Sequence, residues 1–171
     1  LSVARECRKP LRRKDALTAR LGTRPCDNLQ VAEPRMTVYL HRHDLPHGLD
    51  LGAVVAIDTE TMGLDPRRDR LCLVQLSTGD GNAHLVQIGK GQTSAPNLAR
   101  LLSDPLVLKL FHFGRFDIAA LKNAFGVTTA PVYCTKIASK LIRTFTDRHG
   151  LKYLLQELIG IDISKQQQTS D

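Results

Sequence analysis

The alternation of apolar and polar residues along the chain becomes regular from Met36 onward. The segment GAVVAID, residues 52–58, is a short apolar and β-branched run, which predicts a strand buried on both faces. RLCLVQLST (residues 70–78) and AHLVQI (residues 83–88) predict two further strands. The intervening GDGN suits a tight reversal because its residues adopt turn conformations readily, so these two strands are expected to form a hairpin.

Helices and strands alternate in the second half of the chain. APNLARLLSD, residues 95–104, carries leucines at the spacing of one helical face, and Pro105 ends the predicted helix. Helices are also predicted over residues 115–126 and 151–160, each closed by a glycine, while LVLKLFHF and PVYC predict strands. This order predicts an α/β fold: a mixed β-sheet with a three-stranded antiparallel start, then alternating helix and strand, flanked by helices.

Length and composition favour one folded domain. The chain has 171 residues, 42% of them hydrophobic and 24% charged, which suits one ordinary core. It has no run of about 18 apolar residues and no apolar segment after its N-terminal arginines, so we expect no membrane span and a cytoplasmic location. The four cysteines form no C-x-x-C pair, which argues against a zinc site, and Cys72 is expected to be a buried free thiol.

The positive charge is concentrated at the N-terminus. Residues 1–36 hold nine Lys/Arg against four Asp/Glu, whereas the remaining residues hold fifteen against thirteen, within a net charge of +7. Residues 1–35 lack a sustained helical or strand period, so they are predicted to be a disordered basic extension, followed by the domain over residues 36–171. Two interpretations of the extension stay open: nonspecific phosphate binding, or a solvated or non-native segment.

Acidic residues follow two of the predicted strands. Asp58 and Glu60 are two residues apart, so in an extended chain they project to one face within about 7 Å of each other. Like charges this close need solvation or a bound cation such as Mg²⁺, although on spacing alone simple capping of a turn is the preferred interpretation of such a pair. Asp117 falls in the first turn of the helix after another strand, where the helix dipole also favours an acid.

Several segments, in the same order and with similar gaps, resemble the ribonuclease D family of 3′–5′ exonucleases. The resemblance runs from about residue 52 to the last residue and is carried by IDTETMGL with DRLCLVQLST, KLFHFGRFDIAAL, YCTKIASKLI and GLKYLLQELIGIDISKQQQTSD. It implies a ribonuclease H-like fold in which Asp58 and Glu60 match the first exonuclease motif and Asp117 the second. It also implies that these three acids are catalytic and hold two divalent metal ions, Mg²⁺ or Mn²⁺.

The resemblance further implies a substrate and a reaction. The family hydrolyses the terminal phosphodiester bond at single-stranded RNA 3′ ends, releasing nucleoside 5′-monophosphates in RNA processing or turnover. DNA stays open as a substrate because the same fold proofreads DNA in polymerases. Thr61, Met62, Leu64 and His112 are the expected substrate contacts, with loop packing as an equally weighted alternative for the first three. The sequence specifies no oligomeric state.

The chain departs from the family pattern at its end. Members of the family continue past the final SD through a helix with a tyrosine and, four residues later, the fourth acid, so the domain is predicted to be incomplete at its C-terminus. The alternative function is therefore a noncatalytic nucleic-acid-binding module or an inactive truncated exonuclease. Tyr153 and Glu157 share the missing motif's spacing, but core packing and a solvent-facing acid are the preferred interpretations there. Arg67, Arg68 and Arg70 form a basic loop that is either phosphate-binding or simply solvated.

Overall fold

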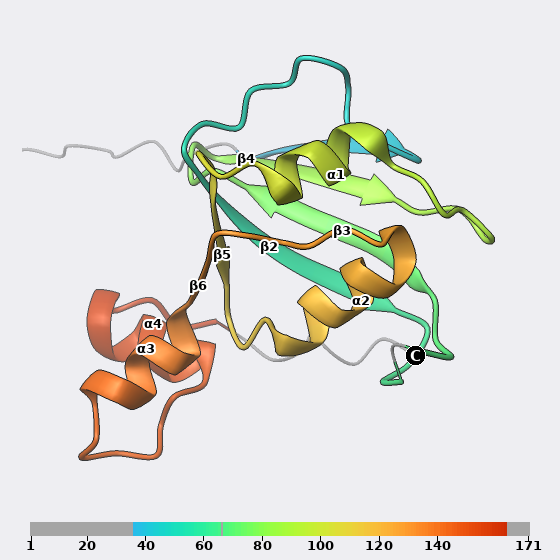
Figure 1. Ribbon diagram of the computed structural model, residues 1–171. Coiled ribbons are helices and arrows are strands. Elements are labelled where there is room, and N and C mark those ends of the chain that lie inside the picture. Colours follow the sequence, from blue (N-terminus) through green and yellow to red (C-terminus); the bar gives the residue numbers. More distant parts are fainter. Residues whose placement is uncertain (1–35, 66, 164–171) are drawn as a thin grey trace, which may run out of the picture. The chain divides into compact units, whose positions relative to one another are not determined.

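The computed structural model describes residues 36–65 and 67–163, all of which belong to the unit Pro34–Asp171 (Figure 1). The predicted disordered extension over residues 1–35 lies outside the described residues. The division of the chain into that extension and an exonuclease domain over residues 36–171 therefore stays a prediction.

A six-stranded mixed sheet with the order β1-β4-β3-β2-β5-β6 organises the described residues. Strands β2, β3 and β4 are antiparallel to one another in turn, while β5 runs parallel to β2, β6 to β5 and β1 to β4. The predicted mixed sheet with an antiparallel start is confirmed. The strands are β1 (Thr37–Arg42), β2 (Val54–Thr61), β3 (Leu71–Ser77), β4 (Asn82–Gln87), β5 (Leu108–Phe111) and β6 (Val132–Cys134).

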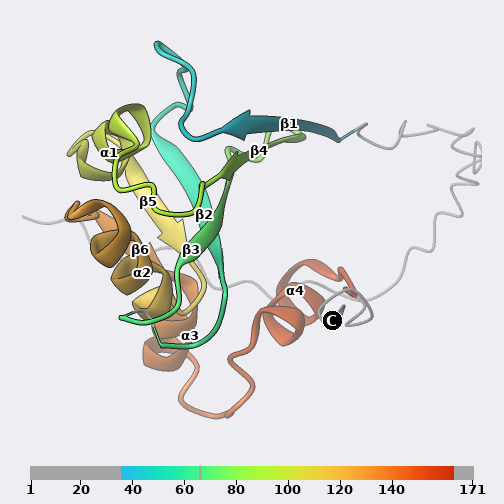
Figure 2. The same cartoon turned by 90° about the vertical axis from the view of Figure 1, so that its right-hand side faces the viewer.

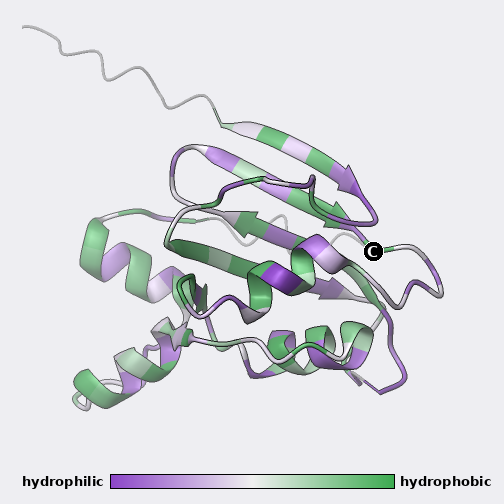
Figure 3. Ribbon diagram, turned by 45° about the horizontal axis from the view of Figure 1, so that its top comes forward, coloured by the Kyte–Doolittle hydropathy of each residue, from purple (hydrophilic) through white to green (hydrophobic). Residues whose placement is uncertain are grey.

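Strand β1 was not predicted from the sequence. Its six residues, TVYLHR, do alternate between apolar and polar side chains, as the colours of the edge strand at the top of Figure 3 show. The strand lies at the edge of the sheet with β4 as its neighbour, and most of its side chains are exposed. The pairing with β4 joins residues some 45 positions apart, a long-range relationship that local periodicity does not reveal.

The helices are α1 (Pro96–Ser103), α2 (Arg115–Phe125), α3 (Thr135–Ile142) and α4 (Leu151–Ile159). Of these, α1, α2 and α4 confirm predicted helices, whereas α3 was not predicted. Gly126 and Gly160 end α2 and α4 in the left-handed conformation, with φ of 68° and 70°, which glycine adopts at little cost. No helix among residues 36–65 and 67–163 has both the length and the apolar character needed to cross a membrane.

The core lies between one face of the sheet and the helices α1 and α2, as Figure 2 shows. In β2, Val55 and Ile57 are buried against these helices, whereas Val54 and Ala56 are exposed on the other face. The prediction that this segment is buried on both faces was wrong, because α1 and α2 cover only one of them. The other face of β2 is therefore open to a ligand.

Strand β3 shows the same one-sided burial. Val74 and Leu76 are buried in the core, whereas Cys72 is only half-buried. Cys72 is a free thiol as predicted, but it is only partly buried and does not belong to the core.

Candidate active site

The open face of β2 carries the two acids of the D-x-E motif. Asp58 and Glu60 are both exposed and alternate with the buried Ile57 and Thr59, so the predicted placement of the two acids on one face is confirmed. Gln75 of β3 lies directly opposite Asp58 in the strand register, and its amide donates a hydrogen bond of 3.4 Å to Oε1 of Glu60. The two strands thus form a polar platform where β2 approaches its end.

Asp117 contacts β2 at Thr59, beyond the part of the strand that pairs with β5. It lies in the first turn of α2, as predicted, and is 8% exposed. Its Oδ1 accepts two hydrogen bonds from Thr59, one from the backbone N–H at 3.1 Å and one from the hydroxyl at 2.7 Å. β5 pairs with β2 only as far as Ala56, which leaves this part of the edge accessible to the carboxylate.

Asp117 and Glu60 both act electrostatically on Asp58. The pKa of Asp58 is raised above its ordinary value, first by burial, then by the negative charge of Asp117 and then by that of Glu60. The nearby backbone N–H of Thr59 acts on this pKa in the opposite direction without cancelling these effects. Because like charges disfavour ionisation of their neighbours, this site attracts protons or cations.

The donor set suits a hard divalent cation, since Mg²⁺ and Mn²⁺ prefer carboxylate oxygens. Asp58, Glu60 and Asp117 supply only such oxygens. Nevertheless, in the part of the chain that the structure describes, no group of three or more His, Cys, Asp or Glu side chains is arranged to hold one metal ion. The three acids therefore match a metal site in chemical type and proximity, while their oxygens do not converge on a common point.

A cleft of about 710 Å³ opens beside Asp58. Its sheet side includes Asp58, Gln75 and His112, and its opposite side is formed by Lys152 and Tyr153 at the start of α4. This volume lies in the range of sites that hold small ligands. The cleft is thus large enough for a nucleotide and has one acidic end.

Tyr153 differs from its expected role, whereas Glu157 does not. Tyr153 was expected to pack in the core, but it is 45% exposed and lines the cleft, because α4 turns that side toward the sheet. Glu157 is exposed, as expected for a solvent-facing acid, and it forms an ion pair with Arg143. The cleft wall at α4 was missed because the sequence specifies the helix without specifying which part of the sheet it faces.

His112 lies just after β5 and lines the cleft, as expected for a residue at a strand end. Its Nδ1 is 2.9 Å from the hydroxyl of Thr135, and that hydroxyl donates to the Phe111 carbonyl at 3.2 Å. A hydroxyl has one hydrogen to donate, so Nδ1 of His112 is the donor to Thr135, and Nε2 is left as an acceptor. Burial, together with the nearby charge of Lys136, lowers the pKa of His112 and favours this neutral form.

The remaining predicted substrate contacts lie at the end of β2, for Thr61, and in the loop that follows, for Met62 and Leu64. Met62 and Leu64 are 68% and 88% exposed, and the hydroxyl of Thr61 donates to the Gly63 carbonyl at 2.5 Å. The cleft beside Asp58 is lined by other residues, so Thr61, Met62 and Leu64 are not part of its wall. They follow the acidic pair directly in the chain.

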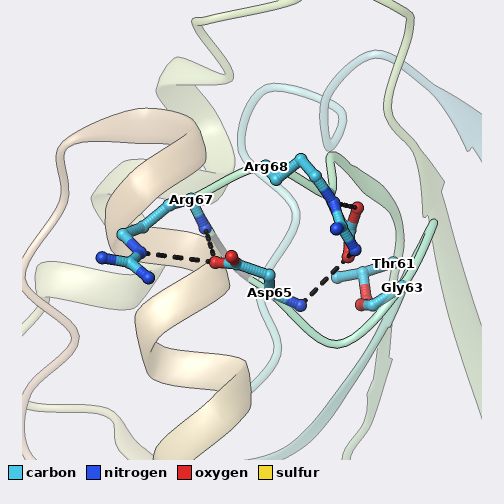
Figure 4. A network of polar contacts seen from close by, with 6 residues as sticks. Thr61, Gly63, Asp65, Arg67 and Arg68 are labelled. Carbon is cyan, nitrogen blue, oxygen red and sulfur yellow. Dashed lines mark hydrogen bonds and ion pairs between the residues drawn. The ribbon is translucent and has the colours of Figure 1, made fainter.

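The basic loop is neutralised internally, as Figure 4 shows. Arg67 reaches Oδ1 of Asp65 at 3.4 Å, and Arg68 makes two hydrogen bonds to Asp69, of 2.8 and 3.0 Å. Arg70 donates to the carbonyl of Ile88 at 3.2 Å. These contacts disfavour the phosphate-binding interpretation, because each guanidinium already has an acceptor.

A family model described as 3′–5′ exonuclease matches residues 43–171. The chain belongs to the 3′–5′ exonuclease family. Among curated relatives, ribonuclease D from Granulibacter bethesdensis is 35% identical over 117 residues, which is 68% of this chain and 29% of the relative. The exonuclease chain therefore spans less than a third of the length of that relative.

Solved structures similar to this chain share its ribonuclease D-like fold. NrnC from Brucella melitensis with bound Mg²⁺ is 58% identical, with a TM-score of 0.73 over 76% of this chain and 65% of that chain. NrnC bound to pGG is also 58% identical, with a TM-score of 0.74 over 80% of this chain and 66% of that chain. RNase D from Escherichia coli is 28% identical, with a TM-score of 0.59 over 70% of this chain and 31% of that chain. The predicted ribonuclease H-like exonuclease fold is confirmed.

Proposed function

We propose that this chain is the catalytic part of a metal-dependent 3′–5′ exonuclease that removes nucleoside 5′-monophosphates from RNA. The observation behind the proposal is that Asp117 is hydrogen-bonded to Thr59, the residue between Asp58 and Glu60 on β2. Burial, together with the charges of Asp117 and Glu60, raises the pKa of Asp58 there. Structural acids are usually paired with cations, whereas Asp58 has two other carboxylates as its charged neighbours and lines an open cleft. Membership of the exonuclease family supports this assignment.

The proposed ligands of two divalent cations, Mg²⁺ or Mn²⁺, are Asp58, Glu60 and Asp117. Bound divalent cations supply an activated water and stabilise negative charge at the scissile phosphate. The residues of this chain hold the cations and orient the phosphate between the acidic platform and the opposite wall. The NrnC structure with bound Mg²⁺, 58% identical to this chain, supports a divalent cation here.

The proposed substrate is single-stranded RNA entering the cleft by its 3′ end. The Nε2 acceptor of His112 is available to a ribose hydroxyl, and the exposed ring of Tyr153 offers a stacking surface for a base. The names of the relatives, ribonuclease D and NrnC bound to pGG, favour RNA, including short RNA, over DNA. We expect the protein to act in the cytoplasm, where RNA is turned over.

The loop after β2 is proposed to contact the terminal nucleotide. Met62 and Leu64 are exposed apolar side chains next to the acidic pair, and such side chains can pack against a base. Thr61 is proposed to fix the turn of this loop through its bond to the Gly63 carbonyl. Thr61, Met62 and Leu64 do not line the cleft, so they are proposed to contact the part of the substrate that lies outside it.

The test uses a 5′-labelled single-stranded RNA incubated with the chain in Mn²⁺ or in EDTA. The proposal predicts a ladder that shortens from the 3′ end, requires Mn²⁺, and is lost in Asp58→Asn. A matched control is Asp50→Asn, since Asp50 is an exposed acid outside this cleft. Loss of cleavage in both variants would point to damage to the fold instead of the site.

A noncatalytic nucleic-acid-binding module is the outcome that would replace this proposal. Its motivating observation is that the three acids do not converge as metal ligands among the residues that the structure describes. In that case the folded chain would leave the RNA intact in Mn²⁺. Its affinity for the same RNA would also be equal in Mn²⁺ and EDTA.

A further inference from the structure

Thr59, the middle residue of the D-x-E motif, makes two contacts with the third acid. Its side chain lies on the buried face of β2, at 8% exposure, opposite to Asp58 and Glu60. Both its hydroxyl and its backbone N–H donate to Asp117, at 2.7 and 3.1 Å. A residue on the core side of the strand thus holds a carboxylate that the proposed function places among the metal ligands.

Both hydrogen bonds end on the same oxygen of Asp117. Oδ1 accepts both of them, and no other residue described by the structure donates a hydrogen bond to Oδ2. A carboxylate with one oxygen fixed by two donors cannot rotate freely about its Cβ–Cγ bond. Oδ2 is therefore the oxygen left for a cation, and its direction is set by Thr59.

We propose that Thr59 is a positioning residue that orients Asp117 for metal binding by holding Oδ1 and presenting Oδ2. This inference rests on the proposed metal-dependent function of the site. Groups that orient metal ligands through hydrogen bonds commonly change metal affinity by about 10- to 100-fold when removed. Thr59 does not line the cleft, so its removal should act on the cation and leave RNA binding unchanged.

The chain provides a matched control for removing a buried threonine hydroxyl. Thr129 is 7% exposed, and its Oγ1 has no hydrogen-bond partner among the described residues. Thr59→Val and Thr129→Val therefore make the same substitution at two buried sites, one with a carboxylate partner and one without. Thr59→Ser keeps the hydroxyl and tests rescue.

The experiment measures Mn²⁺ affinity of the chain and these variants by calorimetry, below the unfolding temperature of each. We expect Thr59→Val to weaken Mn²⁺ binding by about 10- to 100-fold, with Thr59→Ser and Thr129→Val within about threefold of the unsubstituted chain. With RNA as substrate, the kcat of Thr59→Val should be lower than that of the unsubstituted chain at low Mn²⁺ and should recover at high Mn²⁺. Its KM for RNA should stay unchanged. Equal Mn²⁺ affinity in Thr59→Val and Thr129→Val would overturn the inference while leaving the metal-dependent function standing. If the unsubstituted chain bound no Mn²⁺, the proposed function and the inference would both fail.

Discussion

The hydroxyl of Ser139 lies 2.9 Å from Nδ1 of His149, and both side chains are buried, at 7% and 8% exposure. Ser139 belongs to α3, and His149 precedes Gly150, the N-cap residue of α4. The pair therefore fixes the connection between the two helices, and through it the wall that α4 places opposite Asp58.

Ser139→Ala tests this connection. The substitution leaves a buried imidazole nitrogen without a partner, which should lower the free energy of unfolding by about 1–3 kcal/mol. Denaturant unfolding provides the measurement. The control is Ser103→Ala, because the hydroxyl of Ser103 is exposed and bonds the Ala99 carbonyl of its own helix, so its loss should stay within about 0.5 kcal/mol. Equal effects of the two substitutions would contradict the role given to the buried pair.

Tyr153 should contribute to RNA binding. If its ring stacks on a base in the cleft, Tyr153→Ala should raise KM for RNA by about fivefold or more, since stacking of one base is worth about 1–3 kcal/mol. Steady-state kinetics on a short RNA separate this effect from kcat. Tyr133 is the matched control: it is 46% exposed, close to the 45% of Tyr153, but lies on β6 outside the cleft wall. An unchanged KM in Tyr153→Ala would exclude the stacking role.

Much of the site followed from local sequence patterns. The two-residue period of a strand placed Asp58 and Glu60 on one face, and a strand followed by a helix placed Asp117 in the first turn of α2. The cleft wall at Tyr153 did not follow, because an amphipathic pattern defines a helix without defining its partner. The pairing of Arg68 with Asp69 was missed for a similar reason: charges next to each other in sequence gave no sign of which would pair.

The acidity of Asp58 should make stability depend on pH in a definite direction. Its pKa in the folded chain is raised above the ordinary 3.8, so ionised Asp58 disfavours the folded state. Below pH 3.8 the carboxyl is protonated in both the folded and unfolded states, and it contributes nothing. As pH rises through the folded-state pKa, the free energy of unfolding should fall.

Asp58→Asn removes this ionisation. In EDTA, the variant should be more stable than the unsubstituted chain at pH 7, and the difference should vanish below pH 3.8. Thermal unfolding at a series of pH values provides the measurement. A variant that is equally stable or less stable at pH 7 would show that burial and the neighbouring carboxylates do not disfavour ionised Asp58 in the folded chain.

The loop after β2 should be stabilised by its own ion pairs. The hydrogen bonds from Arg68 are the main cause that lowers the pKa of Asp69 to about 2, with a further contribution from the backbone of Asp65. Arg68→Ala should therefore return the pKa of Asp69 most of the way toward 3.8, as measured by NMR titration of the carboxyl carbon. Arg67→Ala serves as the control because Arg67 pairs with Asp65 instead. If Arg67→Ala raised the pKa of Asp69 as much as Arg68→Ala, the pairing in Figure 4 would be wrong.

The most direct test of the three-acid site compares the single-turnover cleavage rates of Asp117→Asn and Asp50→Asn on 5′-labelled RNA with saturating Mn²⁺. Asp117→Asn keeps the size of the side chain but removes the charge that faces Asp58, whereas Asp50 lies outside the cleft. We expect the cleavage rate of Asp117→Asn to be at least about 100-fold lower than that of the unsubstituted chain. Asp50→Asn should cleave at the rate of the unsubstituted chain. Equal cleavage by the two folded variants would contradict the claim that these acids form the active site.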